Sequence, residues 1–394
     1  MLESFANFLQ NTGLYALISS GGIDAVKTII MIVIACVLLY LAIVKKFEPL
    51  LLLPIAFGML LSNLPMIKDS SAIMMHTEFF TNPEYMTDGK YINVGYICQH
   101  GGLLDLLYLG VKLGIYPPLI FVGIGCMTDF GPLIANPKSI LLGAAAQFGV
   151  FFTFVGALVL SALVPSINFG IKEAASIGII GGADGPTAIY VTKSLAPALL
   201  PAIAVAAYSY MALIPVIQPP IMKLMTRKKD RMIVMEQLRP VSKTEKILFP
   251  IIVTIIVALI IPDAVSLVGC LMLGNLMKES GVVERLTKMA QNELMNIITL
   301  FLGVTVGATA TASSFLSAQT IGIIVLGLIA FCFSTVGGLF LGDIMCWVTK
   351  GKVNPLIGSA GVSAVPMAAR VSQTVGQKEN PSNFLLMHAM GPNV

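Results

Sequence analysis

Charge is the scarcest property of this sequence. Charged side chains make up 11% of its 394 residues, whereas soluble domains carry about 25%. Hydrophobic residues make up 56% of the chain, and its mean hydropathy is +0.89. A composition this apolar excludes an ordinary soluble domain and predicts a protein that crosses a membrane several times.

Several catalytic signatures are also missing. The sequence has no P-loop, no GxSxG or HExxH motif and no CxxC pair, so an ATP-driven pump or a membrane protease has no support. Five of the six cysteines lie in or beside apolar stretches without metal spacing and are expected to be small buried hydrophobes. Cys98 and His100 together give only a weak metal signal.

Long apolar runs fill most of the chain. A run of about 20 residues is long enough to cross the hydrocarbon layer as a helix. Residues 1–66 predict an interfacial helix, without the basic start of a cleavable signal peptide, followed by two scaffold spans. The expected spans are Ala25–Val44, Phe47–Met66, Ile140–Val164, Leu199–Leu224, Ile247–Ile261 continuing in Ala264–Met277, and Ile321–Leu341.

The positive charge is concentrated in one linker, residues 226–246 and their flanks. Its basic residues are Lys223, Arg227, Lys228, Lys229, Arg231, Arg239, Lys243 and Lys246. By the positive-inside rule this linker is cytoplasmic, so the net charge of +4 does not indicate nucleic acid. Docking of an acidic cytosolic partner is a compatible second reading. Residues 67–101 are polar and are expected to form a loop outside the lipid.

Two apolar halves, 102–225 and 247–394, flank the linker and contain a weak repeat. Gly181–Thr192 aligns without gaps on Gly361–Ser372, with matching Gly, Pro, Ala and Val positions. Short broken apolar segments at equivalent places in two halves are typical of transporters built from inverted repeats. We therefore expect an all-α polytopic membrane protein whose two inverted repeats bring broken helices and hairpin tips together near the membrane midplane.

The first of these segments contains an acid, Asp184, in the run Gly-Gly-Ala-Asp-Gly-Pro-Thr. Ionisable groups at membrane depth are costly and usually line ion or substrate paths. Glycine and proline interrupt the helix and free carbonyl groups that can coordinate a cation. We predict Asp184 as a Na⁺ ligand, aided by Ser363 and Asn354, and also as a carboxyl that can take up a proton when Na⁺ leaves.

The second segment contains a cation, Arg370, whose planar guanidinium suits a carboxylate or a ureido oxygen, although it could also extend to the membrane interface. Tyr208 and Tyr210 lie inside an apolar run, where a buried phenol needs a partner. Either tyrosine could donate a proton or simply pack. Asp129 and Asp343 are as consistent with helix caps as with binding.

Three runs together carry a family resemblance. They are Gly181–Thr187, Asn354–Arg370 and His388–Val394, and with them the chain resembles the beta subunit of sodium-translocating, biotin-dependent decarboxylases over nearly its whole length. These are the oxaloacetate, methylmalonyl-CoA, glutaconyl-CoA and malonate decarboxylase pumps. Family members continue past Gly-Pro-Asn-Val with another apolar helix, whereas this sequence stops at Val394.

The resemblance implies a function and a set of site residues. The chain would decarboxylate carboxybiotin and couple this to Na⁺ export with proton uptake by alternating access. The catalytic residues would be Asp184, Arg370 and Tyr210, with Arg370 also contacting the cofactor. The Na⁺ ligands would come from Asp184, Asn354, Gly358, Ser363 and Asn393.

The resemblance also implies partners and a location. Biotin would be carried by a partner, since this chain has no Ala-Met-Lys-Met biotinylation signal. The implied partners are a carboxyltransferase alpha subunit, a biotin carrier domain and a small membrane gamma or delta subunit, in the cytoplasmic membrane of a prokaryote. Association of several copies in the complex stays open. On physics alone, a Na⁺-coupled carboxylate transporter working without biotin is the alternative.

Overall fold

The computed structural model describes residues 12–19, 21–46, 49–65, 75–80, 82–87, 91–362 and 366–393. Within these ranges the regular structure is helical, apart from strands β1 (Met86–Thr87) and β2 (Tyr91–Ile92), which pair antiparallel. The all-α prediction is therefore confirmed. Among the described residues, three continuous helical segments are long and apolar enough to cross a membrane, or up to five segments if each bent helix pair counts as one span.

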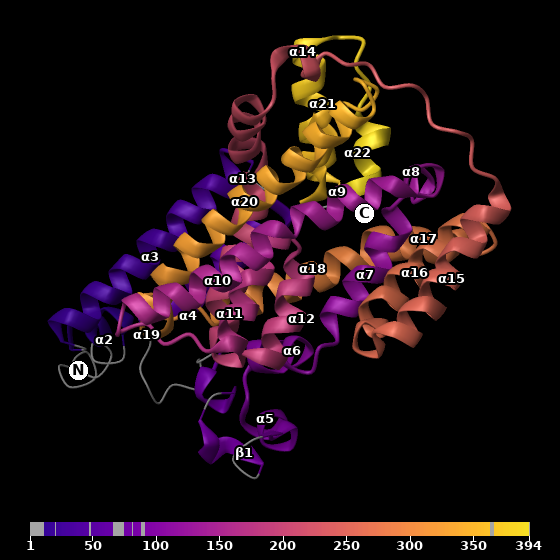
Figure 1. Cartoon of the computed structure of the whole chain (residues 1–394). Coiled ribbons are helices and arrows are strands. Elements are labelled where there is room, and N and C mark those ends of the chain that lie inside the picture. The colour runs from indigo at the N-terminus through magenta and orange to yellow at the C-terminus, as the bar shows by residue number, and fades with distance from the viewer. Residues whose placement is uncertain are drawn as a thin grey trace, which may run out of the picture.

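The N-terminal part forms a scaffold at one side of the bundle (Figure 1). Its elements are α2 (Gly13–Ser19), α3 (Gly22–Ile43), α4 (Pro49–Asn63), η1 (Thr77–Phe80), η2 (Pro83–Tyr85) and α5 (Val94–His100). Helix α3 covers the predicted first span, whereas α4 is shorter than the predicted second span, at 15 residues. The expected polar loop carries the β1–β2 hairpin and α5, below the bundle in this view.

The first apolar half consists of short, broken helices followed by a long one. Its elements are α6 (Leu103–Lys112), α7 (Tyr116–Met127), α8 (Gly131–Ala135), η3 (Pro137–Ser139), α9 (Ile140–Ala146), α10 (Phe148–Leu163), α11 (Ile171–Gly178), η4 (Ile179–Gly182), α12 (Gly185–Leu195), η5 (Pro197–Leu199) and α13 (Leu200–Met225). Helices α6 and α7 meet at 70°. This half therefore crosses the bundle in segments.

The linker and the second half follow. Their elements are α14 (Lys228–Arg231), α15 (Lys243–Ile260), η6 (Pro262–Ala264), α16 (Val265–Ser280), α17 (Glu284–Met289), the π-helical turn η7 (Ala290–Leu294), α18 (Met295–Ala308), α19 (Ala312–Phe315), α20 (Ala318–Val348), η8 (Pro355–Gly361), α21 (Met367–Glu379) and α22 (Leu386–Asn393). Beyond α14 the linker runs extended over one end of the molecule to α15 (Figure 1).

Helix α20 organises the site region. It packs against α9, α10 and α13, and both broken segments, η4 and η8, lie against it. Glycine makes the η8 contact possible: a Cβ on Gly358 would lie 2.0 Å from the carbonyl oxygen of Gly338, and one on Gly338 would lie 2.1 Å from that of Gly358. The two predicted broken segments are thus held on one helix, although the inverted relation between the halves stays a prediction.

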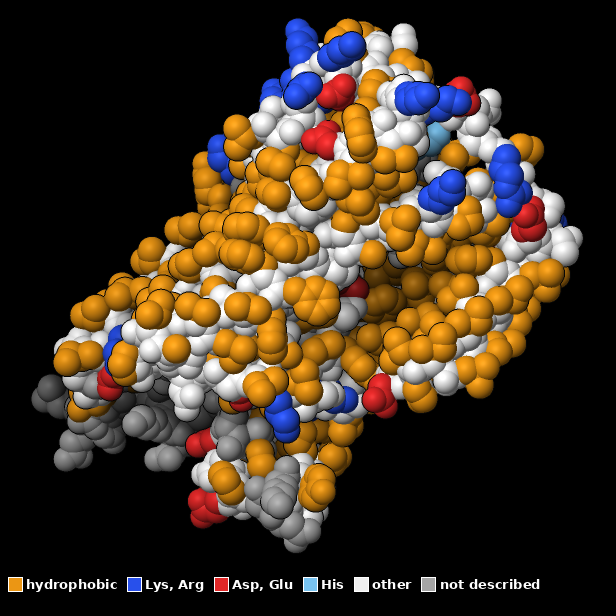
Figure 2. Space-filling model, viewed as in Figure 1, with side chains coloured by type: hydrophobic (Ala, Val, Ile, Leu, Met, Phe, Trp, Pro, Cys, Tyr) orange, Lys and Arg blue, Asp and Glu red, His pale blue; other side chains and the backbone are white. Residues whose placement is uncertain are grey.

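Large apolar side chains cover much of the outer face (Figure 2). Exposed examples are Val33 on α3, Phe151 on α10 and Ile255 on α15. An exposed apolar area of this extent is expected where the partner is lipid. Charged side chains gather mainly at the end of the molecule that carries α14 and the linker (Figures 1 and 2). This distribution matches that of a membrane protein.

Candidate functional site

The first broken segment is centred on Asp184. The α11 helix tightens into the η4 turn, Ala183 takes left-handed angles of φ 52° and ψ 38°, and Asp184 is extended, with φ −121° and ψ 100°. Helix α12 then begins at Gly185 with Pro186 in its first turn, where the missing proline N–H is not needed. The carboxyl group of Asp184 therefore stands at the positive end of a helix, which favours negative charge.

Asp184 lines a large cavity of about 630 Å³, here called the Asp184 cavity. Its polar wall combines residues of both halves: Gly182, Asp184 and Thr187 around the first break, with Gly361, Gly391 and Asn393 from η8 and α22. The remaining wall is mostly apolar and includes Phe130, Phe249 and Leu271. Figure 2 shows a deep hollow lined with hydrophobic side chains on this face of the molecule.

The polar wall presents several oxygen atoms. The Thr187 hydroxyl donates a hydrogen bond to Oδ2 of Asp184. The amide nitrogen of Asn393 donates to the carbonyl oxygens of Ala360 at 2.8 Å and Val362 at 3.3 Å, and so ties α22 to the end of η8. Carboxylate, amide and carbonyl oxygens are the ligands that hard cations prefer. The arrangement can hold a small cation between the two halves.

Tyr208 is the tyrosine next to Asp184. Its ring packs on Gly185, where a Cβ would approach a ring carbon to 2.2 Å, and its hydroxyl is buried with no hydrogen-bond partner among the described residues. Tyr210, the predicted catalytic tyrosine, instead donates its hydroxyl to the carbonyl oxygen of Ile324 on α20. Tyr210 does not line the Asp184 cavity, so its catalytic role stays a prediction.

Gly358 lies on η8 and Asn354 is the N-cap residue just before it, and neither lines the cavity. The amide nitrogen of Asn354 donates to the carbonyl oxygens of Arg231 at 3.0 Å and Ile233 at 2.9 Å, and its oxygen accepts from the Leu356 N–H at 3.0 Å. In this conformation Asn354 joins η8 to the basic linker, and Gly358 permits the contact with α20. Ser363 lies outside the described residues.

Arg370 lies on α21, and its side chain is exposed. Its carbonyl oxygen accepts a hydrogen bond from the Thr374 hydroxyl at 2.9 Å, within the helix. It does not line the Asp184 cavity. Of the predicted site residues, the structure therefore brings together Asp184 and Asn393, and it places Arg370, Tyr210, Asn354 and Gly358 outside the cavity wall.

Sequence reasoning missed two polar residues of the cavity wall, Thr187 and Gln147. Thr187 had a signal, because a hydroxyl three residues after Asp184 at the start of a helix can reach back to the carboxylate. Gln147 had none, since it stands between α9 and α10 in an otherwise apolar sequence and reaches the cavity only through the tertiary fold.

Comparison with known proteins agrees with the family resemblance of the sequence. The family described as "Na+-transporting oxaloacetate decarboxylase beta subunit" matches residues 27–394. The chain is 58% identical to the methylmalonyl-CoA decarboxylase beta subunit of Propionigenium modestum over 394 residues, covering 100% of this chain and 95% of that protein.

Two further relatives are beta subunits of decarboxylases named for other substrates. The chain is 56% identical to the glutaconyl-CoA decarboxylase beta subunit of Acidaminococcus fermentans over 365 residues, which is 93% of this chain and 88% of that protein. It is 51% identical to a probable oxaloacetate decarboxylase beta chain of Vibrio cholerae over 422 aligned positions, covering 100% of this chain and 96% of that one.

Proposed function

We propose, from the premise that the chain belongs to the family of Na⁺-transporting oxaloacetate decarboxylase beta subunits, that its Asp184 cavity couples the decarboxylation of carboxybiotin to Na⁺ export. The protein is a membrane subunit of a sodium-pumping decarboxylase. One observation carries the assignment of the site: the carboxylate at the first broken helix and the amide of Asn393 from the second half line the same cavity.

Asp184 holds Na⁺ and a proton in turn. The carboxylate, with oxygens from Asn393 and the η8 end, binds Na⁺ from the cytoplasmic side. A proton from the outer side moves onto Asp184, which removes the charge that holds Na⁺ and releases the ion outward. Carboxybiotin, the substrate, loses CO₂, and its ureido nitrogen takes this proton from the Asp184 carboxyl, which returns to its ionised form. Export of one charge costs about 2.3 kcal/mol per 100 mV, so the chemistry must depend on Na⁺ occupancy.

The apolar wall of the cavity supports this coupling. Apolar side chains such as Phe130 and Phe249 line the cavity, and an ion held in such surroundings interacts more strongly with a carboxylate than in water. The volume of about 630 Å³ is within the range of small-molecule sites, about 300 to 1,000 Å³. The cavity can therefore accommodate a bicyclic ureido ring as well as an ion.

Arg370 acts outside the cavity wall in this proposal. Its exposed guanidinium on α21 receives the carboxylate or ureido oxygen of carboxybiotin as the carrier domain of a partner approaches. Carboxyltransferase, carrier and small membrane subunits dock on the cytoplasmic end that carries the basic linker. Tyr210, Asn354, Gly358 and Ser363 take their predicted roles in another state of the alternating-access cycle.

The test is Na⁺-dependent release of CO₂ from free carboxybiotin by the purified membrane complex. Asp184→Asn is expected to weaken Na⁺ activation at least about tenfold, since loss of a charged ligand costs about 1.5 to 3 kcal/mol. Asp343→Asn is the matched control, because Asp343 is a half-buried acid on α20 that does not line the cavity. Normal Na⁺ affinity in Asp184→Asn would remove the proposed ligand role.

Transport assays in vesicles distinguish the pump from the alternative function, a Na⁺-coupled transporter. A Na⁺-coupled carboxylate transporter would accumulate a carboxylate in vesicles containing this chain alone, with neither biotin nor the partner subunits. The proposed pump would take up ²²Na⁺ into inverted vesicles only with the complete complex and its decarboxylation substrate.

A further inference from the structure

Three side chains with a formal charge are buried in the part of the chain that the structure describes: Asp105, Lys112 and Arg231. Asp105 accepts hydrogen bonds from the ring nitrogen of His76 at 2.6 Å and from its backbone N–H at 2.7 Å. Arg231 pairs with Glu379 at 3.2 Å. Lys112, which is 9% exposed, has no carboxylate partner among the described residues. Of these three buried charges in the described part of the chain, Lys112 is the one without an ion-pair partner.

The surroundings of Lys112 only partly stabilise its ammonium group. The group lies over the ring of Tyr108, 5.6 Å from the ring centre, which gives a cation–π contact. Such a contact is weak beside the cost of burying an unpaired charge, and buried charges are usually paired. Asp105, the other buried charged residue of α6, is hydrogen-bonded to His76 and does not pair with Lys112. The described residues therefore supply no counter-charge to the Lys112 ammonium group.

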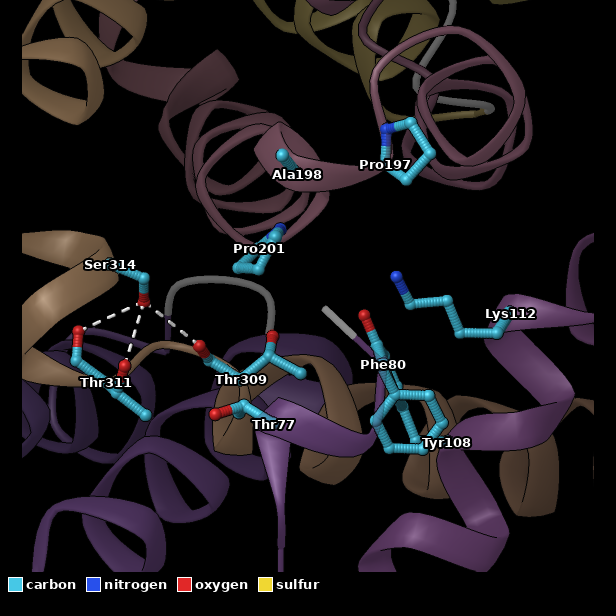
Figure 3. A pocket seen from close by; sticks show the side chains of 10 residues that line it. All are labelled: Thr77, Phe80, Tyr108, Lys112, Pro197, Ala198, Pro201, Thr309, Thr311 and Ser314. Carbon is cyan, nitrogen blue, oxygen red and sulfur yellow. Dashed lines mark hydrogen bonds between the residues drawn. The ribbon is translucent and has the colours of Figure 1, made fainter. Parts of the chain in front are cut away.

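The ammonium group instead faces a small, partly open space, here called the Lys112 pocket. The pocket has a volume of about 190 Å³, and its walls come from α6, from η5 and the start of α13, from the η1 turn and from the break between α18 and α19. In Figure 3, Lys112 reaches into the space from one side, Pro197, Ala198 and Pro201 bound it on another, and Thr309 and Ser314 lie across from the lysine. It shares no lining residue with the Asp184 cavity.

The hydroxyl groups across the pocket are engaged with the backbone. Thr309 donates to the carbonyl oxygen of Val306 at 2.6 Å, and Ser314 to those of Thr309 and Thr311 at 3.2 and 3.1 Å. No aspartate or glutamate is among the described residues that line the pocket. The strongest unused donor facing the space is thus the ammonium group, and its field is positive. This selects an anion and disfavours Na⁺.

We propose that the Lys112 pocket is a binding site for one small monovalent anion, of which chloride is the test case. The ammonium group of Lys112 supplies the charge and the hydrogen bonds, and the small volume excludes large organic anions. The anion would join α6 to the start of α13 and to the α18–α19 break, on the side of the bundle away from α14 (Figure 1). The site is separate from the proposed Na⁺ path.

The experiment is equilibrium binding of ³⁶Cl⁻ to the purified chain in detergent, at fixed Na⁺, with gluconate as the replacing anion. We expect saturable binding of one chloride per chain in the wild type and affinity at least about tenfold weaker in Lys112→Gln, since the charged donor is lost. Lys172→Gln, a change of an exposed lysine on α11, is the control and should bind like the wild type.

A second variant covers the case in which Lys112→Gln does not fold. Ala198→Leu keeps the ammonium group but fills the space opposite it, and it should also weaken chloride binding. Absence of saturable binding in the wild type would overturn the proposal. So would wild-type affinity in folded Lys112→Gln or, if that variant is not obtained, in Ala198→Leu. Because the assay needs neither Na⁺ transport nor decarboxylation, its outcome is independent of the role of Asp184.

Discussion

A carboxylate inside an apolar bundle depends on the few atoms around it. At residue 184 these are the hydroxyl of Thr187, the free N–H groups at the start of α12 and the oxygen atoms across the cavity. The helix end and the hydroxyl stabilise the negative charge, while the cavity leaves one side open for an ion. Asp184 is thus only partly satisfied by the protein, which is what an exchangeable ligand requires.

The two tyrosines of α13 should behave differently when each loses its hydroxyl. In Tyr208→Phe we expect the free energy of unfolding to stay the same or rise slightly, because the hydroxyl has no partner among the described residues. We expect Na⁺ activation of decarboxylation to weaken several-fold, since the ring carbon that bears this hydroxyl packs on Gly185, the residue after Asp184. Thermal unfolding and Na⁺ titration of CO₂ release measure the two effects.

Tyr210→Phe is the matched comparison. It removes the hydrogen bond to the carbonyl oxygen of Ile324 and should cost about 1 kcal/mol of unfolding free energy. Equal effects of the two substitutions on Na⁺ activation would argue against a distinct role of Tyr208.

At the scale of elements, the site depends on short helices that approach each other closely. Segment η8 lies against α20 backbone to backbone, and η4 packs against both α10 and α20. The η8 contact needs a residue without a side chain at Gly358, because a Cβ there would overlap the carbonyl oxygen of Gly338. Glycine in η8 therefore has a packing function in addition to its role in breaking helices.

This packing gives a stability prediction for Gly358→Ala. The added methyl group would lie 2.0 Å from the Gly338 oxygen, so η8 must shift, and we expect a loss of about 1 to 3 kcal/mol. Thermal unfolding in detergent without Na⁺ measures it. Gly269→Ala on α16 is the control, since its nearest neighbour would be 3.8 Å away. An unchanged Tm in Gly358→Ala would show that η8 is not held as described.

The start of α15 gives a pH prediction outside the lipid. Ser242 and Glu245 form a capping box, and Arg239 binds Glu245 at 2.9 Å. The hydrogen bond from Arg239, with those from Ser242, lowers the pKa of Glu245 from 4.5 to about 2. Stability from the ionised carboxylate is therefore fully present above pH 4.5 and is lost as the pH falls towards 2.

Comparison of the wild type with Glu245→Gln tests this sign. The wild type should have the higher Tm at pH 6, and the difference should shrink steadily below pH 4.5. Glu236→Gln, at an exposed linker position, serves as the control. A Tm difference that grows on acidification would contradict the role of the capping box.

At the scale of the whole molecule, charge sets the orientation. The basic linker with α14 lies at one end, and the β1–β2 hairpin with α5 lies at the other (Figure 1). Lysine and arginine are retained on the cytoplasmic side, so the hairpin end should face outward. The Asp184 cavity and the Lys112 pocket then lie at different depths along one bundle.

Cysteine labelling in intact cells checks this orientation. Cys98 on α5 is exposed and should react with a membrane-impermeant maleimide added outside, whereas Val234→Cys in the linker should react only after the membrane is opened. A Cys98→Ser background identifies the labelled site. Labelling of the linker position in sealed cells would reverse the proposed topology.

The sequence by itself determined the membrane class, the helical fold, the break at Asp184 and the family. The first three follow from local composition, since apolar length, glycine and proline act on the chain nearest to them. The family follows from the resemblance of three motif runs. Weakly periodic apolar sequence contains little information about where a helix begins and ends. The predicted second span is therefore longer than helix α4.

Only the tertiary structure decided which predicted residues meet. It brought Asn393 to the wall that contains Asp184, packed the Tyr208 ring on Gly185 and turned the Tyr210 hydroxyl towards α20, and left Lys112 at a small pocket. These outcomes depend on how helices distant in sequence pack, and side-chain direction within the bundle is set by that packing. The sequence gives the residue types, but the neighbours of a buried polar group are determined only when all the helices have packed together.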